Sequence, residues 1–386
     1  MKASTIPIFL AFLVMGVADA MGPLSAAVKT NYDLSNVLAT LLPFFVFIAF
    51  AAFSVPGGVL AGRIGKKKLL MLGLGLNAGA MAVPSLMDPS FPLLLACIFV
   101  LGVGTTFLQV AGNPIMHDVS PEGAYSRNLS LAQGFKGIGS SASSYLVAGV
   151  GAIGLFATMG WRGAFPLFCA LMVVALIWVA VTPVDETKAD TPPSIGSSLA
   201  LLKNPVFAMA VLGIFLYVGA EVCMGTFLKP ALAKLGMSDE KAALWGPSTF
   251  FILLTIGRLG AGVVLNFISA RACFVGSAVM GLAGAVLMML GQPALAIVGV
   301  VLAGLGFANI WPMLFSITVE EKPEASNELS GLMCMAISGG AVVPLLMGQM
   351  LDMKLGAMSF VVPAVCFAYL LVLSLKSLGG GKKAVA

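Results

Sequence analysis

Charged residues are scarce in this chain of 386 residues. Asp, Glu, Lys and Arg together make up 10% of the sequence, whereas hydrophobic residues make up 59%. The mean hydropathy is +1.04, and soluble domains carry about 25% charged residues. An ordinary soluble globular protein is therefore excluded. The composition indicates an integral membrane protein whose surroundings are a lipid bilayer.

Residues and motifs that catalysis would need are also missing. His117 is the only histidine, and the sequence contains no P-loop, no GxSxG and no HExxH motif. These absences argue against an ATP-driven pump and against the commonest hydrolases. The six cysteines are scattered through apolar segments without metal-ligand spacing, so we expect free thiols. We predict that the protein is not an enzyme and has no metal site and no cofactor.

The sequence contains many long apolar runs. A helix needs about 20 residues to cross the hydrocarbon core, and the runs divide into roughly twelve predicted membrane helices. In the first half these are Ile6 to Val28, Val37 to Ala61, Leu69 to Leu86, Phe91 to Met116, Leu129 to Leu155 and Gly163 to Val181. In the second half they are Pro205 to Leu228, Ala243 to Asn266, Cys273 to Leu290, Ala294 to Thr318, Leu329 to Leu351 and Met358 to Leu375. The pattern predicts an all-α membrane protein.

A hydrophilic segment separates the two halves. Residues 182–203 contain Asp185, Glu186, Asp190, Pro192 and Pro193, which is typical of a linker. The sequence therefore predicts a six-helix bundle over 1–181, a linker over 182–203 and a second six-helix bundle over 204–386. Basic residues are more numerous on one side of the predicted helices, and the positive-inside rule puts both termini and the linker in the cytoplasm. The net charge of +5 then reflects orientation, and we expect no nucleic-acid partner.

The two halves resemble each other in sequence. Short groups of residues recur at a nearly constant offset of about 200 residues, which indicates duplication. Parallel repeats related by an axis along the membrane normal are a transporter architecture, with the site near the midplane. The matched groups are Phe12, Leu13 and Gly16 with Phe215, Leu216 and Gly219; Gly58 and Val59 with Gly262 and Val263; and Leu129, Ser130 and Gly139 with Leu329, Ser330 and Gly339.

Four polar residues stand inside apolar segments between Gly102 and Ser144. They are Gln109, Asn113, Gln133 and Lys136. Polar groups at membrane depth are costly unless they meet one another, water or a ligand. This stretch is therefore interpreted as one wall of a polar cavity.

Two carboxylates, Asp19 and Glu221, occupy nearly repeat-related places in the first and seventh predicted helices. A carboxylate at that depth can be neutralised by a proton, and its two charge states prefer different surroundings. We predict that both residues couple transport to an ion, with a structural ion pair as the alternative. Lys136 needs a partner: it either pairs with one of these acids, binds an anionic substrate such as an acidic sugar, or reaches an interface.

Three residues of the second half complete the predicted set. Arg258 lies about 12 Å inside the end of its helix, and functional and structural interpretations both remain open. Asn309 and Trp311 stand just before Pro312, which is expected to break the helix. An amide beside an aromatic face suits a sugar, whose C–H face stacks on a ring while its hydroxyls meet amides. Packing is the alternative for Trp311.

The chain resembles the major facilitator superfamily and, within it, the fucose and glucose/galactose symporter family. The resemblance extends over nearly the whole chain. It includes Gly58 to Lys67 with Arg63 and Gly65, Leu108 to Pro114, Arg127 to Gln133, Phe215 to Val222 with Tyr217, Gly257 with Arg258, and Gly331 to Pro344.

This resemblance implies a secondary transporter that imports a monosaccharide by alternating access across the bacterial inner membrane, as a monomer. The coupling ion would be a proton, with sodium as the alternative. The residues predicted to bind substrate are Gln109, Asn113, Gln133, Lys136, Tyr217, Asn309 and Trp311; those predicted to have conformational or structural roles are Gly58, Arg63, Gly65 and Arg258.

This chain also departs from the family pattern. Gly62 stands where many members carry an aspartate, Gln109 replaces a glutamate of fucose-type members, and Lys136 replaces an asparagine. The fucose-type aspartate aligns with Gly22, one helical turn after Asp19. Transport of an organic anion through Lys136, export of drugs or metabolites, uncoupled facilitation and a receptor role stay open as alternatives.

Overall fold

The computed structural model describes residues 5–17, 21–150, 154–156, 158–187 and 192–380, and every regular element in these ranges is helical. Two compact units result. The first contains Met1–Tyr125, Phe135–Ala200 and Lys322–Met335; the second contains Ser126–Gly134, Leu201–Glu321 and Ala336–Ala386. Each unit therefore includes a short segment from the other half of the sequence. The predicted boundaries at 182–203 remain a prediction.

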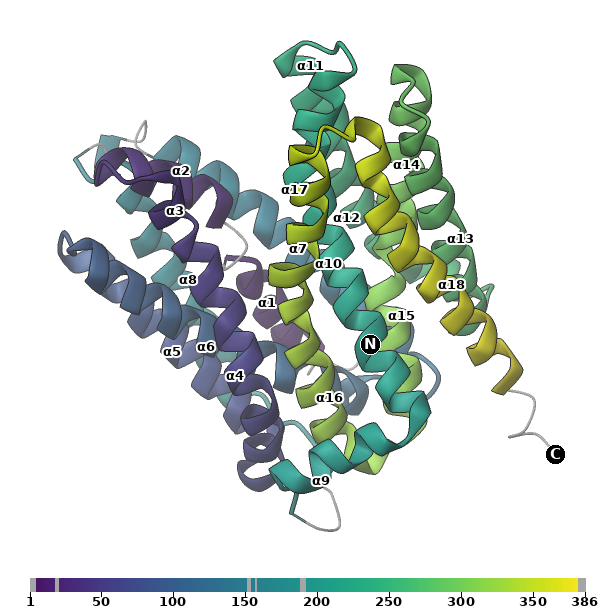
Figure 1. Ribbon diagram of the computed structural model, residues 1–386. Helices are drawn as coiled ribbons and strands as arrows, with labels where there is room; N and C mark the ends of the chain where they lie inside the picture. The colour runs from purple at the N-terminus through teal and green to yellow at the C-terminus, as the bar shows by residue number, and fades with distance from the viewer. Residues whose placement is uncertain (1–4, 18–20, 151–153, 157, 188–191, 381–386) are drawn as a thin grey trace. The chain divides into compact units, whose positions relative to one another are not determined.

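Helices of the first unit run side by side in Figure 1, with α5 against both α6 and α8, and α4 against both α6 and α16. Gly73 of α5 and Gly104 of α6 face each other, since a Cβ on Gly73 would lie 2.7 Å from the Gly104 carbonyl oxygen. Small residues let membrane helices approach this closely. The helices are α1 (Thr5–Met15), α2 (Met21–Asn31), α3 (Asn36–Ala39), α4 (Leu41–Ile64), α5 (Lys66–Leu86), α6 (Phe91–Val119), α7 (Tyr125–Gly149), α8 (Ala164–Val181), α9 (Ile195–Ala200) and α16 (Ser326–Met335).

The second unit is built around α10 and α13. Helix α10 packs on α17 and α18, and α13 packs on α14 and α18 (Figure 1). The first residues of α7, Ser126–Gly134, also belong to this unit. Its helices are α10 (Pro205–Lys234), α11 (Asp239–Ala243), α12 (Thr249–Val264), α13 (Ala270–Met289), α14 (Pro293–Ala308), α15 (Ile310–Glu320), α17 (Gly339–Asp352) and α18 (Val361–Gly380).

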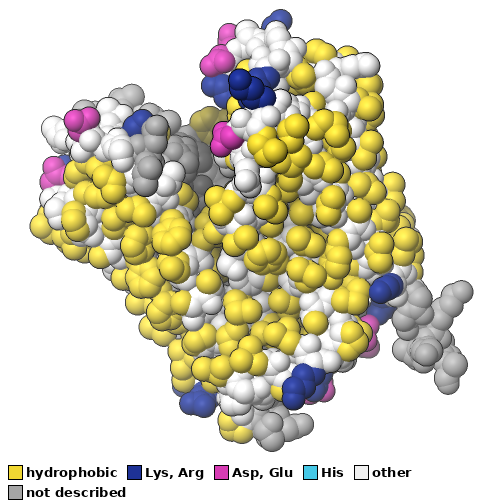
Figure 2. Space-filling model, viewed as in Figure 1, with side chains coloured by type: hydrophobic (Ala, Val, Ile, Leu, Met, Phe, Trp, Pro, Cys, Tyr) yellow, Lys and Arg dark blue, Asp and Glu magenta, His cyan; other side chains and the backbone are white. Residues whose placement is uncertain are grey.

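Ten helices among the described residues are long and apolar enough to cross a membrane. Their surface agrees with this, because Leu345 of α17 is 69% exposed and Val365 of α18 is 63% exposed. Figure 2 shows hydrophobic side chains over much of the visible surface. Charged side chains lie towards the helix ends in the same view. The prediction of an all-helical membrane protein is confirmed.

Two of the predicted runs are not among these ten. Within Ile6 to Val28, α1 covers only Thr5–Met15 and α2 begins at Met21, while Asp19 lies outside the described residues. The run Leu129 to Leu155 forms most of α7, which is long enough but contains Gln133, Lys136 and several serines. Polar side chains therefore lower its hydropathy below that of a typical membrane-crossing helix.

Two glycines predicted from the repeat make equivalent contacts in their own units. A Cβ on Gly139 of α7 would overlap the backbone of Leu13 in α1, and a Cβ on Gly339 of α17 would overlap the backbone of Phe215 in α10. In both cases the two helices cross with their backbones touching, which only glycine permits.

Gly339→Ala should therefore lower the stability of the protein by about 1–3 kcal/mol, because the new methyl group must displace the Phe215 backbone. Gly276→Ala in α13 is the matched control, since nothing lies within 4 Å of a Cβ there. The measurement is thermal unfolding of both purified variants in detergent. Equal melting temperatures for the two variants would contradict the close approach.

Candidate functional site

Two prolines interrupt helices at the predicted site, one in each unit. Pro114 in α6 has no N–H, so it cannot bond the carbonyl of Val110 four residues earlier. The hydroxyl of Ser330 on α16 donates to that carbonyl oxygen at 2.8 Å. Pro312 at the start of α15 likewise cannot bond Ala308, and Nε of Arg258 donates to the Ala308 oxygen at 3.1 Å. Each freed carbonyl is thus bound by a side chain from another helix.

Arg258 is the centre of a polar cluster in the second unit. Its Nη2 donates to the hydroxyl of Tyr217 at 3.1 Å and lies 3.7 Å from Oε2 of Glu221. Tyr217 and Glu221 are four residues apart on α10 and so share one face of the helix. The Arg258 side chain is 8% exposed and that of Glu221 is 24% exposed. Glu221 therefore carries an ion pair with Arg258, a partner that the sequence did not suggest for it.

The break between α14 and α15 places Asn309 and Trp311. Asn309 has φ −109° and ψ 3°, its Nδ2 donates to the Gly257 carbonyl at 3.1 Å, and its Oδ1 accepts from Ser130 at 3.0 Å. The Trp311 ring lies 6.0 Å from that of Phe315. Its buried Nε1–H has no hydrogen-bond acceptor among the described residues, and such an orphan donor is costly unless a ligand or water satisfies it.

Ser130 comes from the first part of α7, which belongs to the second unit. Gln133 is three residues further along the same helix and is 2% exposed. Ser126, one turn before Ser130, bonds the hydroxyl of Ser316 at 2.7 Å. A polar face of α7 thus lies against α15 and its helix break.

The first unit holds Gln109, Asn113 and Lys136. Gln109 and Asn113 are one turn apart on α6 and both buried. Oε1 of Gln109 has no donor within the part of the chain that the structure describes, whereas Nδ2 of Asn113 donates to Sγ of Cys334 at 3.8 Å. Lys136 of α7 is half-buried and belongs to the same unit as Gln109, Asn113 and Cys334. Polar groups of α6, α7 and α16 therefore gather here.

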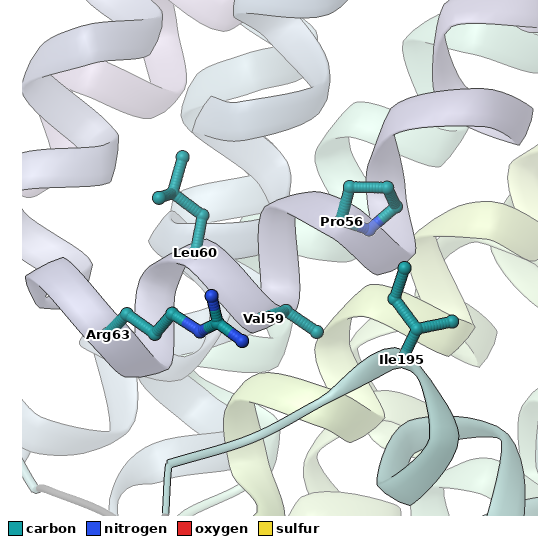
Figure 3. Close-up of a pocket in the computed structure, with 5 residues that line it drawn as sticks. All are labelled: Pro56, Val59, Leu60, Arg63 and Ile195. Atoms are coloured by element: carbon teal, nitrogen blue, oxygen red, sulfur yellow. The ribbon is translucent and has the colours of Figure 1, made fainter.

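The other three predicted conformational residues, Gly58, Arg63 and Gly65, lie elsewhere in the first unit. A Cβ on Gly58 of α4 would lie 3.2 Å from Cα of Gly331 in α16. Gly65 has φ +97° in the turn between α4 and α5, a conformation that side chains rarely adopt. Arg63 is exposed and lines a pocket with Pro56, Val59, Leu60 and, from α9, Ile195 (Figure 3).

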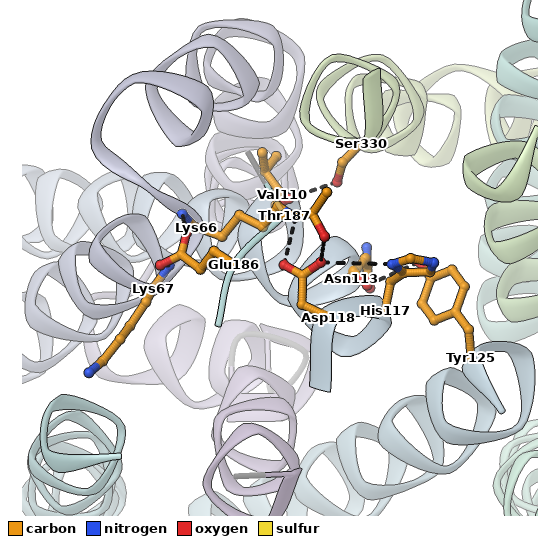
Figure 4. Close-up of polar contacts among 10 residues, drawn as sticks. All are labelled: Lys66, Lys67, Val110, Asn113, His117, Asp118, Tyr125, Glu186, Thr187 and Ser330. Atoms are coloured by element: carbon orange, nitrogen blue, oxygen red, sulfur yellow. Dashed lines mark hydrogen bonds and ion pairs between the residues drawn. The ribbon is translucent and has the colours of Figure 1, made fainter. Parts of the chain in front are cut away.

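A second polar cluster in the first unit went unpredicted (Figure 4). Nζ of Lys66 and Oδ2 of Asp118 are 2.6 Å apart, and both side chains are 1% exposed. Oδ1 of Asp118 accepts from the Thr187 hydroxyl at 2.8 Å and lies 3.7 Å from Nδ1 of His117. The only available signal was an aspartate at the end of an apolar run, which gives no partner by itself.

Comparison with known proteins decides the family. The model of the Major Facilitator Superfamily matches residues 8–376. The chain belongs to the Major Facilitator Superfamily. This confirms the family predicted from the sequence and agrees with a transporter, not an enzyme.

Relatives within the superfamily come from the predicted branch. A glucose/galactose transporter of Brucella abortus is 29% identical over 362 residues, which cover 89% of this chain and 86% of that protein. An L-fucose-proton symporter of Escherichia coli is 21% identical over 373 residues, covering 88% of this chain and 85% of that protein.

The fold is shared with solved superfamily structures. The crystal structure of the E. coli fucose:proton symporter matches with a TM-score of 0.83 at 19% identity, covering 97% of this chain and 99% of that chain. A proton:xylose symporter matches with a TM-score of 0.73 at 15% identity, covering 97% and 94%.

Asp118→Asn should destabilise this superfamily member by about 3–5 kcal/mol, because it leaves the buried Lys66 ammonium without a countercharge. Asp88→Asn is the control, since Asp88 pairs with Arg162 at 3.4 Å but is 66% exposed. Thermal unfolding measures both variants. An equal fall in melting temperature for the two variants would contradict a buried Lys66–Asp118 ion pair.

Proposed function

We propose that this protein imports a neutral monosaccharide, of the glucose, galactose or fucose type, by proton-coupled alternating access across the bacterial inner membrane. The observation that carries the proposal is a pair of orphan groups: the Gln109 Oε1 acceptor and the Trp311 Nε1–H donor, both buried and unpartnered within the described ranges. A sugar hydroxyl can both accept and donate a hydrogen bond, so a sugar suits the orphan group of each unit. The names of the relatives support the same substrate class.

The proposed architecture is that of twelve crossing helices in two bundles, residues 1–181 and 204–386, related by a pseudo-two-fold axis. The repeated sequence groups support this, as do the equivalent backbone contacts at Gly139 and Gly339. The linker over 182–203 and both termini lie in the cytoplasm in this proposal, because of the distribution of Lys and Arg. The working unit is a monomer.

Coupling is assigned to Glu221, with Asp19 as the second carboxylate. Protonation of Glu221 removes the countercharge of Arg258, which keeps its bonds to Tyr217 and to the Ala308 carbonyl. The ion pair thus has two charge states with different local contacts. A proton can shift the equilibrium between the inward and outward forms only by as much as its affinity for the protein differs between those two forms. Sodium is the alternative ion.

Lys136 supports a second candidate, which is transport of an acidic sugar or another organic anion. Its ammonium is half-buried in the first unit near the polar groups of α6 and α16. A cation held there would pair directly with a carboxylate substrate. Competition of glucuronate against glucose for the purified protein separates the two candidates.

Glu221→Gln should abolish accumulation of labelled sugar driven by an imposed pH gradient in proteoliposomes while leaving counterflow exchange, because only the former needs a titrating group. Glu240→Gln, an exposed position in α11, is the control and should retain both activities. Labelled D-glucose, D-galactose and L-fucose are tested in parallel. Full accumulation by Glu221→Gln would remove Glu221 from the coupling assignment, and no uptake of any sugar would overturn the proposed function.

Trp311→Phe should raise the half-saturation concentration about tenfold, since it keeps an aromatic ring but removes one hydrogen bond to the ligand. Trp178→Phe is the matched control because Trp178 is 43% exposed on α8. The measurement is counterflow at varied sugar concentration. An unchanged half-saturation for Trp311→Phe would assign Trp311 to packing.

A further inference from the structure

The linker between α8 and α10 is docked on the first unit at several points. It contributes a carboxylate from Glu186 and a hydroxyl from Thr187 (Figure 4). It also contributes the ring of Pro193 and the short helix α9, whose first residue is Ile195 (Figure 3). A linker that served only as a tether would need none of these contacts.

Glu186 supplies the cap that the start of α5 lacks. The residue before this helix is Gly65, which has no side chain to accept the free N–H groups of the first turn. Oε2 of Glu186 accepts from the backbone N–H of Lys66 at 2.5 Å, and Oε1 accepts from that of Lys67 at 3.1 Å. A carboxylate here both satisfies orphan donors and complements the helix dipole. The cap therefore anchors the linker to α5.

The next contacts extend the anchorage to α4 and α6. The hydroxyl of Thr187 donates to Asp118 at the end of α6. A Cβ at Gly62 of α4 would overlap the ring of Pro193, so Gly62 leaves room for the linker to lie directly on the helix. Ile195 then enters the pocket that Arg63 lines (Figure 3).

Helix α9 joins this anchored linker to α16. It contacts both α4 and α16, and the hydroxyl of Ser197 donates to Oε1 of Glu328 at 2.7 Å. Helix α16 itself packs on α4, where a Cβ on Gly331 would lie 2.9 Å from the Ser54 carbonyl oxygen. In the chain, α16 leads into α17 of the second unit. Any exchange of α16 between packing partners must therefore release α9 as well.

We propose that Glu186 is a positioning residue of the transport cycle: by capping α5 it holds the linker as a strap across α4 and α16. The strap favours the arrangement in which α16 is packed on α4 and α6. Loss of the cap shifts the equilibrium towards release of α16. This role goes beyond the proposed function, since it requires that α16 alternates but not that the substrate is a sugar.

Cys334 is a natural reporter of this equilibrium. Its thiol lies on α16, is fully buried and accepts from Asn113 on α6, so a maleimide reaches it only when α16 leaves α6. The experiment measures the rate at which N-ethylmaleimide labels Cys334 in purified full-length protein without sugar, quantified on the Cys334 peptide by mass spectrometry. Glu186→Gln should label about fivefold faster than the wild type, the factor expected for loss of one helix cap.

Asp185→Asn is the matched control, because it removes the same charge from an exposed neighbouring position. It should label at the wild-type rate, and Glu186→Asp should restore most of the protection. Ser197→Ala removes the link to Glu328 together with the local bonds between the Ser197 hydroxyl and the Ser194 backbone. It should also accelerate labelling, which tests the strap even if Glu186→Gln does not fold. Unchanged labelling in both Glu186→Gln and Ser197→Ala, or equal acceleration in Asp185→Asn, would overturn the proposal. Because no sugar is present, failure of the sugar assignment leaves this result unaffected.

Discussion

The need to satisfy backbone carbonyls in buried helices shapes both units of this protein. Pro114 and Pro312 each free a carbonyl within a buried stretch, and an unpaired carbonyl there would cost several kcal/mol. Ser330 and Arg258 satisfy them. In each case the freed carbonyl is bound by a polar side chain from a different helix, next to residues proposed to bind substrate.

Charged side chains in buried positions must also find partners. Lys66 with Asp118 and Arg258 with Glu221 are paired across helices, because a lone ion in a low-dielectric setting is strongly disfavoured. The two pairs differ in exposure. Lys66 and Asp118 are almost completely buried, whereas Glu221 keeps 24% of its side chain exposed. The fully buried Lys66–Asp118 pair is suited to holding helices together, while the partly exposed Glu221 is the carboxylate proposed to couple transport.

Short segments carry the connection between the two halves of the sequence. Residues 126–134 group with the second unit and residues 322–335 with the first. Small side chains make this possible: Gly58 and Gly331 bring α4 and α16 into backbone contact, and Gly262 meets Leu131 of α7. Superfamily members alternate between two forms, and glycine contacts without interlocking side chains can form and separate with little repacking. The docked linker adds polar bonds beside one of these contacts, the contact between α4 and α16.

The sequence by itself determined the membrane environment and the helical secondary structure, because hydropathy over about 20 residues reports directly on the bilayer. It also determined the family, because the motifs around Gly58, Asn113 and Arg258 are local. It also indicated which polar residues lie at depth, although their roles stay predictions. Partner choice was decided only by the tertiary structure. Nothing local in the sequence joins Glu221 to Arg258, Lys66 to Asp118 or Glu186 to the start of α5. Such pairs form between residues distant in sequence, and they depend on which helix faces meet once glycine contacts have set the helix positions.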